Sequence, residues 1–252
     1  IRYPNGVDAA SFFEKNAPRG TPRWVRTVTL PSPGSSLDRE TVTYVVCNDL
    51  PTVVWLANLA VLEMHVPQWR VHGERPQNPD RLVVDLDPGA PATVIECCQV
   101  ALLLAETLAD DGLLAYPTTS GSKGMQMYVP LDAKADVRAV HGYARRLAER
   151  LEKEHPRLVV SRMEKRLRGG KVLVDWSQNN AAKTTVAPYS LRGREQPTVS
   201  TPVTWDEVER ATRSSARTRL PLRFDTRAVL ARVDDLGDLT APLHEEAYAL
   251  PT

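Results

Sequence analysis

The segment Asp85-Leu86-Asp87 carries two carboxylates at the end of an apolar run that begins at Arg81. Successive side chains of a strand alternate between its two faces, so Asp85 and Asp87 are expected to project together. Neighbouring carboxylates repel each other unless a cation lies between them, and hard divalent cations prefer such oxygen ligands. The pair therefore predicts a metal site, although the same pattern also occurs on surface strands that hold no metal.

A third acid, Asp175, ends a second apolar run, for which we predict a strand from Lys171 to Trp176. Asp175 could complete a three-carboxylate site for two metal ions. Two metals suit phosphoryl transfer, because one activates an attacking 3′-hydroxyl and the other holds the triphosphate and the leaving pyrophosphate. The alternative is that Asp175 simply ends its strand and caps a turn.

The loop TTSGSKG at 118–124 offers anion-binding chemistry. Its two glycines allow backbone amides to turn inward as a nest, Ser120 adds a donor and Lys123 adds charge. The spacing is not that of a Walker A motif. A plain hairpin loop explains the same residues equally well.

Donors for phosphate or sugar are also dense in the stretch behind Asp175, which includes Gln178, Lys183 and Arg192. The alternative for this stretch is a polar loop between two strands, but its attachment directly behind Asp175 favours a functional role.

Two smaller features are open to two interpretations each. Phe12 and Phe13, followed by Lys15, can stack on bases if they are exposed, or belong to the core if they are buried. His65 is either a residue of a site or a buried histidine with its hydrogen bonds satisfied.

The surrounding pattern predicts the elements that must position these residues. Apolar spacing indicates helices over 91–110 and 134–154, a helix that opens at Pro51 with Asp49 as its cap, a helix over 205–213 that begins with a Thr204–Glu207 capping box, and a helical tail from Asp225. We predict a strand over 81–87, a loop or a flexible hairpin tip over 31–40, and a polar loop over 73–80. This alternation of strands and helices predicts an α/β or α+β fold.

The composition sets broad limits. The length of 252 residues suits one large domain or two small ones. The net charge is only +1, so the overall charge does not indicate nucleic-acid binding. Cys47, Cys97 and Cys98 form neither a disulfide framework nor a zinc site, which fits a reducing cytoplasm, and Cys97 and Cys98 are expected to pack within a helix. No apolar run is long enough to span a membrane, and no secretory signal is visible.

Taken in order, several motifs together resemble one family. They are RYPNGV with FFEK, HVPQWR, RLVVDLDPG, TSGSKG, KVLVDWSQN, and KTT with PYSLRGR. They are similar to the polymerase domain of the bacterial end-joining ligase D and to its stand-alone primase-polymerase relatives, within the archaeo-eukaryotic primase superfamily. The resemblance covers about residues 1–235 and implies a primase-type catalytic core, with mixed or antiparallel sheets and flanking helices.

The resemblance also implies roles for individual residues. The metal-binding and catalytic acids would be Asp85, Asp87 and Asp175. The nucleotide contacts would be His65 near the sugar, together with Ser120, Lys123, Gln126, Gln178, Lys183 and Arg192. The contacts to DNA would come from Phe12, Phe13 and the neighbouring Lys15.

The activity implied is that of a nucleotidyltransferase, which adds nucleotides, with ribonucleotides preferred, to DNA 3′-ends at short gaps or breaks. Two Mn²⁺ or Mg²⁺ ions and a nucleoside triphosphate would serve each active site. The implied partners are gapped or broken DNA, the end-binding protein Ku and a DNA ligase, in the nucleoid-associated cytoplasm of a bacterium. We expect residues 1–252 to form a single catalytic domain that lacks the N-terminal segment of the family, including basic residues that grip a 5′-phosphate.

One departure from the family pattern leaves a second function open. The family usually has a histidine near the triphosphate where this chain has Gln126, and glutamine donates a hydrogen bond but cannot titrate. A DNA-end-binding module with weak or no synthesis is therefore the alternative.

Overall fold

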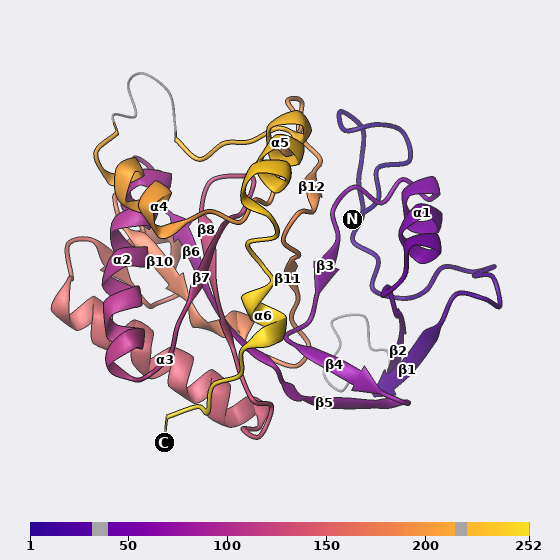
Figure 1. Ribbon diagram of the computed structural model, residues 1–252, viewed down its shortest axis with the longest axis horizontal. Coiled ribbons are helices and arrows are strands. Elements are labelled where there is room, and N and C mark those ends of the chain that lie inside the picture. The colour runs from indigo at the N-terminus through magenta and orange to yellow at the C-terminus, as the bar shows by residue number, and fades with distance from the viewer. Residues whose placement is uncertain (32–39, 215–220, 252) are drawn as a thin grey trace.

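The computed structural model describes residues 1–31, 40–214 and 221–251, and its centre is a five-stranded sheet (Figure 1). The strands run in the order β7 (Tyr116–Thr119), β8 (Met125–Pro130), β6 (Arg81–Pro88), β10 (Val172–Asp175) and β9 (Val159–Val160). All neighbours are antiparallel except β10 and β9, which are parallel. The predicted strands at 81–87 and 171–176 are thus confirmed, with bounds shifted by one residue.

Helices cover one face of this sheet. They are α2 (Val94–Asp110), α3 (Val137–Glu154) and α4 (Trp205–Thr212). Leu82, Val84 and Leu86 of β6 point toward them and are almost fully buried in the main hydrophobic core. Cys97 and Cys98 of α2 are completely buried in the same core, as expected from the helical pattern.

The helix starts follow local capping chemistry. α2 begins at Val94 rather than at 91, because Thr93 caps it in a capping box with Glu96. The capping box predicted for α4 is present, with Thr204 and Glu207 exchanging side-chain and backbone hydrogen bonds.

The N-terminal third forms a separate layer beside the main sheet (Figure 1). It contains the hairpin β1 (Thr27–Pro31) and β2 (Thr41–Val45), the helix α1 (Leu50–Asn58), and the strands β3 (His65–Val66), β4 (Trp69–His72) and β5 (Arg75–Pro79). α1 is capped by Asp49, whose side chain accepts from the Thr52 amide, as predicted. Most of the predicted loop at 31–40 lies outside the described residues.

The prediction of a polar loop over 73–80 is wrong. Residues Arg75–Pro79 form β5, which pairs antiparallel with β4 around a turn at Gly73. Four of its five residues are exposed, so the strand is defined by backbone pairing and carries no apolar alternation that a sequence pattern could reveal.

The remaining elements join the two layers. β11 (Thr185–Val186) pairs with β3, and β12 (Leu191–Arg192) pairs with β13 (Thr198–Val199). Short 3₁₀ turns span Lys165–Leu167 and Trp176–Gln178. The tail is helical at α5 (Thr226–Leu236) and α6 (Pro242–Glu245), as predicted from Asp225 onward.

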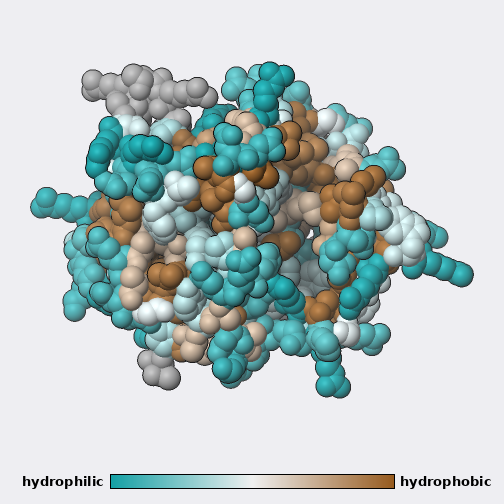
Figure 2. Space-filling view, in the orientation of Figure 1, coloured by the Kyte–Doolittle hydropathy of each residue, from teal (hydrophilic) through white to brown (hydrophobic). Residues whose placement is uncertain are grey.

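The second face of the sheet is only partly covered. Leu243 of α6 packs there against Val83 and Tyr128, while the neighbouring stretch of the same face carries the acids. Figure 2 shows hydrophobic patches over α1 and α5, where Leu50, Val54 and Leu230 are exposed, on a surface that is otherwise mostly hydrophilic. Within the described residues, the structure contains no helix that is both long and apolar enough to cross a membrane.

Candidate active site

Strand register brings three carboxylates together on the partly open face of the sheet. β6 supplies Asp85 and Asp87, and β10 supplies Asp175, which lies directly opposite Asp85 in the antiparallel pairing. Each contributes an oxygen, and these three oxygens lie within 4.8 Å of one another. Asp175 is buried, Asp85 is half-buried and Asp87 is exposed, so the group reaches from the interior to solvent.

The negative charges of this group are only partly compensated within the described residues. Burial, followed by the charges of Asp87 and Asp175, raises the pKa of Asp85 to about 8. Burial and the charge of Asp175 also raise the pKa of Asp87, and the charges of Arg168 and Lys123 offset only part of this rise. Among the described residues, none of the three acids forms an ion pair with a basic side chain. Three clustered carboxylate oxygens that no basic side chain pairs directly have the ligand chemistry that a hard divalent ion prefers.

Asp175 is held by the residues that follow it. It accepts hydrogen bonds from the backbone amide and hydroxyl of Ser177, at 3.0 and 2.6 Å, and from the side-chain amide of Gln178 at 2.8 Å. The ammonium of Lys183 donates to the Ser177 hydroxyl at 2.7 Å. Two residues predicted to contact the nucleotide, Gln178 and Lys183, are therefore part of the network around an acid.

Asn179, part of the donor-rich stretch behind Asp175, secures this turn, a role that the sequence did not predict. Its side chain is buried and exchanges hydrogen bonds with both backbone groups of Val83, at 2.9 and 2.7 Å. It thereby ties the turn after β10 to β6 beside the acids. A polar side chain in a predicted polar loop gave no signal for this role.

The TSGSKG loop is the hairpin turn between β7 and β8, close to the acids. The Ser120 hydroxyl oxygen accepts hydrogen bonds from the amides of Ser122 and Gly124, both at 3.2 Å. These amides point into the turn, as expected for an anion-binding nest, but they bind the Ser120 side chain. Gly124 is required for this packing, because a Cβ there would lie 2.0 Å from the Leu86 carbonyl oxygen. Lys123 is exposed and lowers the pKa of Asp87 through its charge, although burial outweighs it.

Gln126 of β8 faces Asp85 from the side opposite Asp175. It is buried, its side-chain oxygen accepts from the Tyr128 hydroxyl at 2.6 Å, and its amide donates to Asp85. The amide is thus oriented by Tyr128 so that a hydrogen-bond donor points at the acid.

Arg192 lies between the hairpin turn and the N-terminal layer. Its aliphatic chain packs against Gly121, where a Cβ would approach the Arg192 Cγ to 2.7 Å. Its charge lowers the pKa of Asp85, although burial and the neighbouring acids outweigh this effect. The guanidinium forms an ion pair with Glu63 at 3.4 Å, and His65 contacts the same carboxylate at 3.4 Å. Glu63 had not been singled out from the sequence.

Comparison with known proteins places this geometry in a family. A sequence model of the family described as "LigD, primase-polymerase domain" matches residues 1–240. The chain belongs to the LigD primase-polymerase family. It is 45% identical over 246 residues to the multifunctional non-homologous end joining protein LigD of Mycolicibacterium smegmatis, which covers 98% of this chain and 31% of that protein. It is 34% identical over 210 residues to the bifunctional non-homologous end joining protein LigD of Bacillus subtilis, which covers 83% of this chain and 32% of that protein.

The polymerase domain from Mycobacterium tuberculosis ligase D, solved in complex with DNA, has the same fold. It aligns with a TM-score of 0.87 and 42% sequence identity, covering 98% of this chain and 84% of the solved chain. The resemblance, the primase-type fold and the nucleotidyltransferase class expected from the sequence are thereby confirmed. The chain spans about a quarter to a third of the length of the curated LigD relatives that it matches.

In this LigD family member the predicted DNA contacts lie on the surface. Phe12 and Phe13 are 44% and 48% exposed, so they do not belong to the core. The Phe13 ring meets the His65 ring edge-on at 5.3 Å, and the Lys15 ammonium lies 5.9 Å from the Phe13 centroid. The exposed Phe13 ring therefore lies beside His65, whereas the Arg2 guanidinium lies over the Phe12 ring, 5.1 Å from its centroid.

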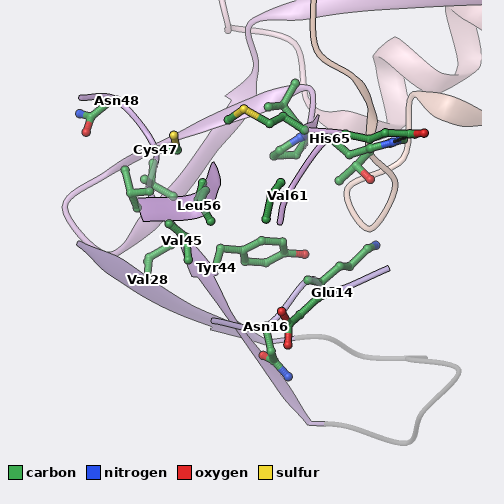
Figure 3. A pocket seen from close by; sticks show the side chains of 18 of the residues that line it. Glu14, Asn16, Val28, Tyr44, Val45, Cys47, Asn48, Leu56, Val61 and His65 are labelled. Carbon is green, nitrogen blue, oxygen red and sulfur yellow. Dashed lines mark hydrogen bonds and ion pairs between the residues drawn. The ribbon is translucent and has the colours of Figure 1, made fainter. Parts of the chain in front are cut away.

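A cavity of about 580 Å³ lies within the N-terminal layer, where the β1–β2 hairpin and α1 face the strands β3 and β4 (Figure 3). Tyr44 reaches across it, with Glu14 and Asn16 toward one end and His65 at the opposite side. Its wall is mainly apolar and does not include the three aspartates. Phe13, Glu63 and His65 form the border that the cavity shares with the predicted nucleotide contacts.

Proposed function

We propose that this protein is a DNA-repair primase-polymerase that adds nucleotides, with ribonucleotides preferred, to DNA 3′-ends at short gaps or breaks. The observation that carries the proposal is the group formed by Asp85, Asp87 and Asp175, whose oxygens lie within 4.8 Å of one another. Clustered carboxylates such as these, with the pKa values of Asp85 and Asp87 raised, suit a site that gains its charge balance from divalent cations.

The three acids would hold two ions, Mn²⁺ or Mg²⁺. Such ions, when bound, supply Lewis-acid activation of the 3′-hydroxyl and neutralise charge on the triphosphate. The protein's own contribution is to keep the acids in place, through the hydrogen bonds from Ser177 and Gln178 to Asp175 and from Gln126 to Asp85.

The remaining predicted residues would supply the contacts to the nucleotide and to DNA. Ser120 and Lys123, from the turn between β7 and β8, and Arg192 would contact the triphosphate, which Arg suits through bidentate hydrogen bonding. His65 would lie near the sugar, and the exposed Phe12 and Phe13 would stack on bases of the DNA, with Lys15 beside them.

We infer partners and setting from the relatives. The M. tuberculosis domain was solved with DNA, and the curated relatives are named for non-homologous end joining, which supports gapped or broken DNA as the substrate. Ku and a DNA ligase would act with the protein in the nucleoid-associated cytoplasm of a bacterium. Residues 1–252 would act as a single catalytic domain.

The test is primer extension on a short gapped duplex with a 5′-phosphate, using Mn²⁺ and either ribo- or deoxynucleoside triphosphates. We expect extension, faster with ribonucleotides, and at least a ~1,000-fold loss in Asp85→Ala with folding intact. Asp235→Ala, which removes an exposed acid of α5, is the matched control and should extend like the wild type. Wild-type extension by a folded Asp85→Ala protein would refute the proposal.

A further inference from the structure

Glu63 is a buried carboxylate that no part of the predicted site includes. Its side chain is only 4% exposed, and it lies two positions before the start of β3 at His65. A buried carboxylate is costly unless donors surround it. Four donors meet this one, and they come from three separate segments of the chain.

The two oxygens of Glu63 have different partners. Oε1 accepts from the Tyr3 hydroxyl at 2.8 Å and from the Gly193 amide at 3.0 Å. Oε2 faces the Nε2 of His65 and the guanidinium of Arg192, both at 3.4 Å. One oxygen therefore anchors the carboxylate to the scaffold, and the other meets two side chains expected to contact the nucleotide.

The anchor is fitted closely. A Cβ on Gly193 would lie 2.1 Å from the Tyr3 ring, so only glycine lets the segment approach near enough for its amide to reach Glu63. Burial alone would raise the pKa of Glu63, but hydrogen bonds from His65 and Tyr3, together with the charge of Arg192, outweigh it and hold this pKa at about 2. The carboxylate is thus a fixed negative charge at any working pH.

Arg192 shows what this charge can direct. Its Nε is buried and has no hydrogen-bond partner among the described residues, while its terminal nitrogen is held by Glu63. Its side chain packs on the Gly121 turn, and its charge lowers the pKa of Asp85. The arginine is therefore fixed at one end by Glu63, beside the Gly121 turn, and its Nε remains free to donate a hydrogen bond.

We propose that Glu63 is a positioning residue, which orients Arg192 toward the triphosphate and His65 toward the sugar of the incoming nucleotide. This inference rests on the proposed function. Because an acceptor-only oxygen faces the Nε2 of His65, that nitrogen carries the proton and donates, which fixes the orientation of the imidazole ring. A single carboxylate thereby couples the two ends of the nucleotide site.

Glu63→Gln separates the two oxygens of the carboxylate. The glutamine oxygen would stay on the anchor side, where Tyr3 and Gly193 offer two donors, and the amide nitrogen would face Arg192 and His65. Arg192 then loses its charge-assisted partner. We expect KM for the nucleotide to rise about 10- to 100-fold, with kcat within about threefold of the wild type, because a grip on the triphosphate acts in ground and transition states alike.

Glu207→Gln is the matched control. Glu207 is also a poorly exposed carboxylate with a lowered pKa, and it pairs with Arg232 at 2.8 Å, but it lies at the start of α4. Its loss should lower the melting temperature without changing KM. A Glu63→Gln protein that is destabilised like Glu207→Gln but keeps the wild-type KM would show a merely structural role and overturn the proposal.

A double-mutant cycle with Arg192→Gln tests whether Glu63 acts through the arginine. In that background Glu63→Gln should raise KM by less than about threefold, whereas full additivity of the two effects would overturn the coupling. Should Glu63→Gln fail to fold, Glu63→Asp keeps the charge but withdraws it from Arg192, and a wild-type KM there would also overturn it.

Nucleotide affinity measured by calorimetry keeps the two proposals apart. If the wild type extends no primer, the proposed polymerase function has failed, and the Glu63→Gln affinity still reports on Glu63. If the wild type extends DNA and Glu63→Gln has both the wild-type KM and the wild-type affinity, only the inference on Glu63 has failed.

Discussion

Two acidic centres lie within reach of Arg192 and meet opposite conditions. Glu63 is surrounded by donors from the protein itself, and these hold its pKa at about 2 against the effect of burial. Asp85 lies beside two further acids and is offset only by the amide of Gln126 and the charge of Arg192, so burial and repulsion raise its pKa to about 8. The protein completes the first centre alone, whereas we propose that a divalent cation from outside balances the second. This contrast separates a positioning carboxylate from a cation site.

The largest expected effect concerns how the stability of the metal-free protein changes with pH. This measurement tests whether Asp85 differs from Glu63 as described. Because the folded state raises the pKa of Asp85 from 3.8 to about 8, it binds more protons than the unfolded chain between these values. This stabilisation is full below about pH 4 and is lost as the pH rises through 8. We expect the melting temperature to fall by several degrees from pH 5 to pH 8, and Mn²⁺ to restore it most at pH 8.

Asp85→Asn is the control for this measurement, because it keeps the shape and removes the titrating group. Its melting temperature should vary less between pH 5 and 8 and should respond less to Mn²⁺. Glu63, whose pKa falls from 4.5 to about 2 on folding, adds stability that is present above pH 4.5 and lost only as the pH drops toward 2. Its titration therefore does not contribute to the change measured between pH 5 and pH 8. An unchanged pH dependence in Asp85→Asn would contradict the assignment.

A smaller effect is expected at Gln126, which donates a hydrogen bond to Asp85 from the neighbouring strand without carrying charge. We expect Gln126→His to speed extension by up to about tenfold, because an imidazole can carry charge toward the triphosphate and transfer protons. Single-turnover extension with saturating nucleotide is the measurement, and Gln126→Met, which removes the donor, should be slower than wild type. A gain above ~100-fold over a nearly inactive wild type that still binds DNA would instead support the end-binding alternative.

Much of this arrangement could be predicted from local patterns, and the rest depends on contacts between distant segments. The shared face of Asp85 and Asp87 follows from strand alternation, and the caps at Asp49 and Thr204 follow from residue type. The register that puts Asp175 opposite Asp85 is set by pairing across 90 positions, for which no local pattern exists. The prediction of an acid cluster therefore needed the family resemblance as well as the strand pattern.

Glu63 and β5 show why the remainder was missed. The donors to Glu63 come from Tyr3 and Gly193, 60 and 130 positions away, so the short segment around it reads only as an apolar run with one acid. β5 is defined by backbone pairing with β4, and its exposed polar side chains resemble those of a loop. Periodicity reports which side chains are buried, and it is silent where the backbone or a single buried charge decides the structure.

The smallest effect expected is that of Tyr3→Phe, which probes the anchor oxygen of Glu63 alone. The variant keeps the ring that packs on Gly193 and removes one of two hydrogen bonds to Oε1, so unfolding should become easier by about 1 kcal/mol. The Gly193 amide still holds Oε1, and Oε2 still faces Arg192, so KM for the nucleotide should change by less than about threefold. Thermal melts and steady-state extension measure the two quantities. If Tyr3→Phe raised KM as much as Glu63→Gln, the two oxygens would not have separate roles, and the carboxylate would act only as a unit that holds the N-terminal layer against the segment around Gly193.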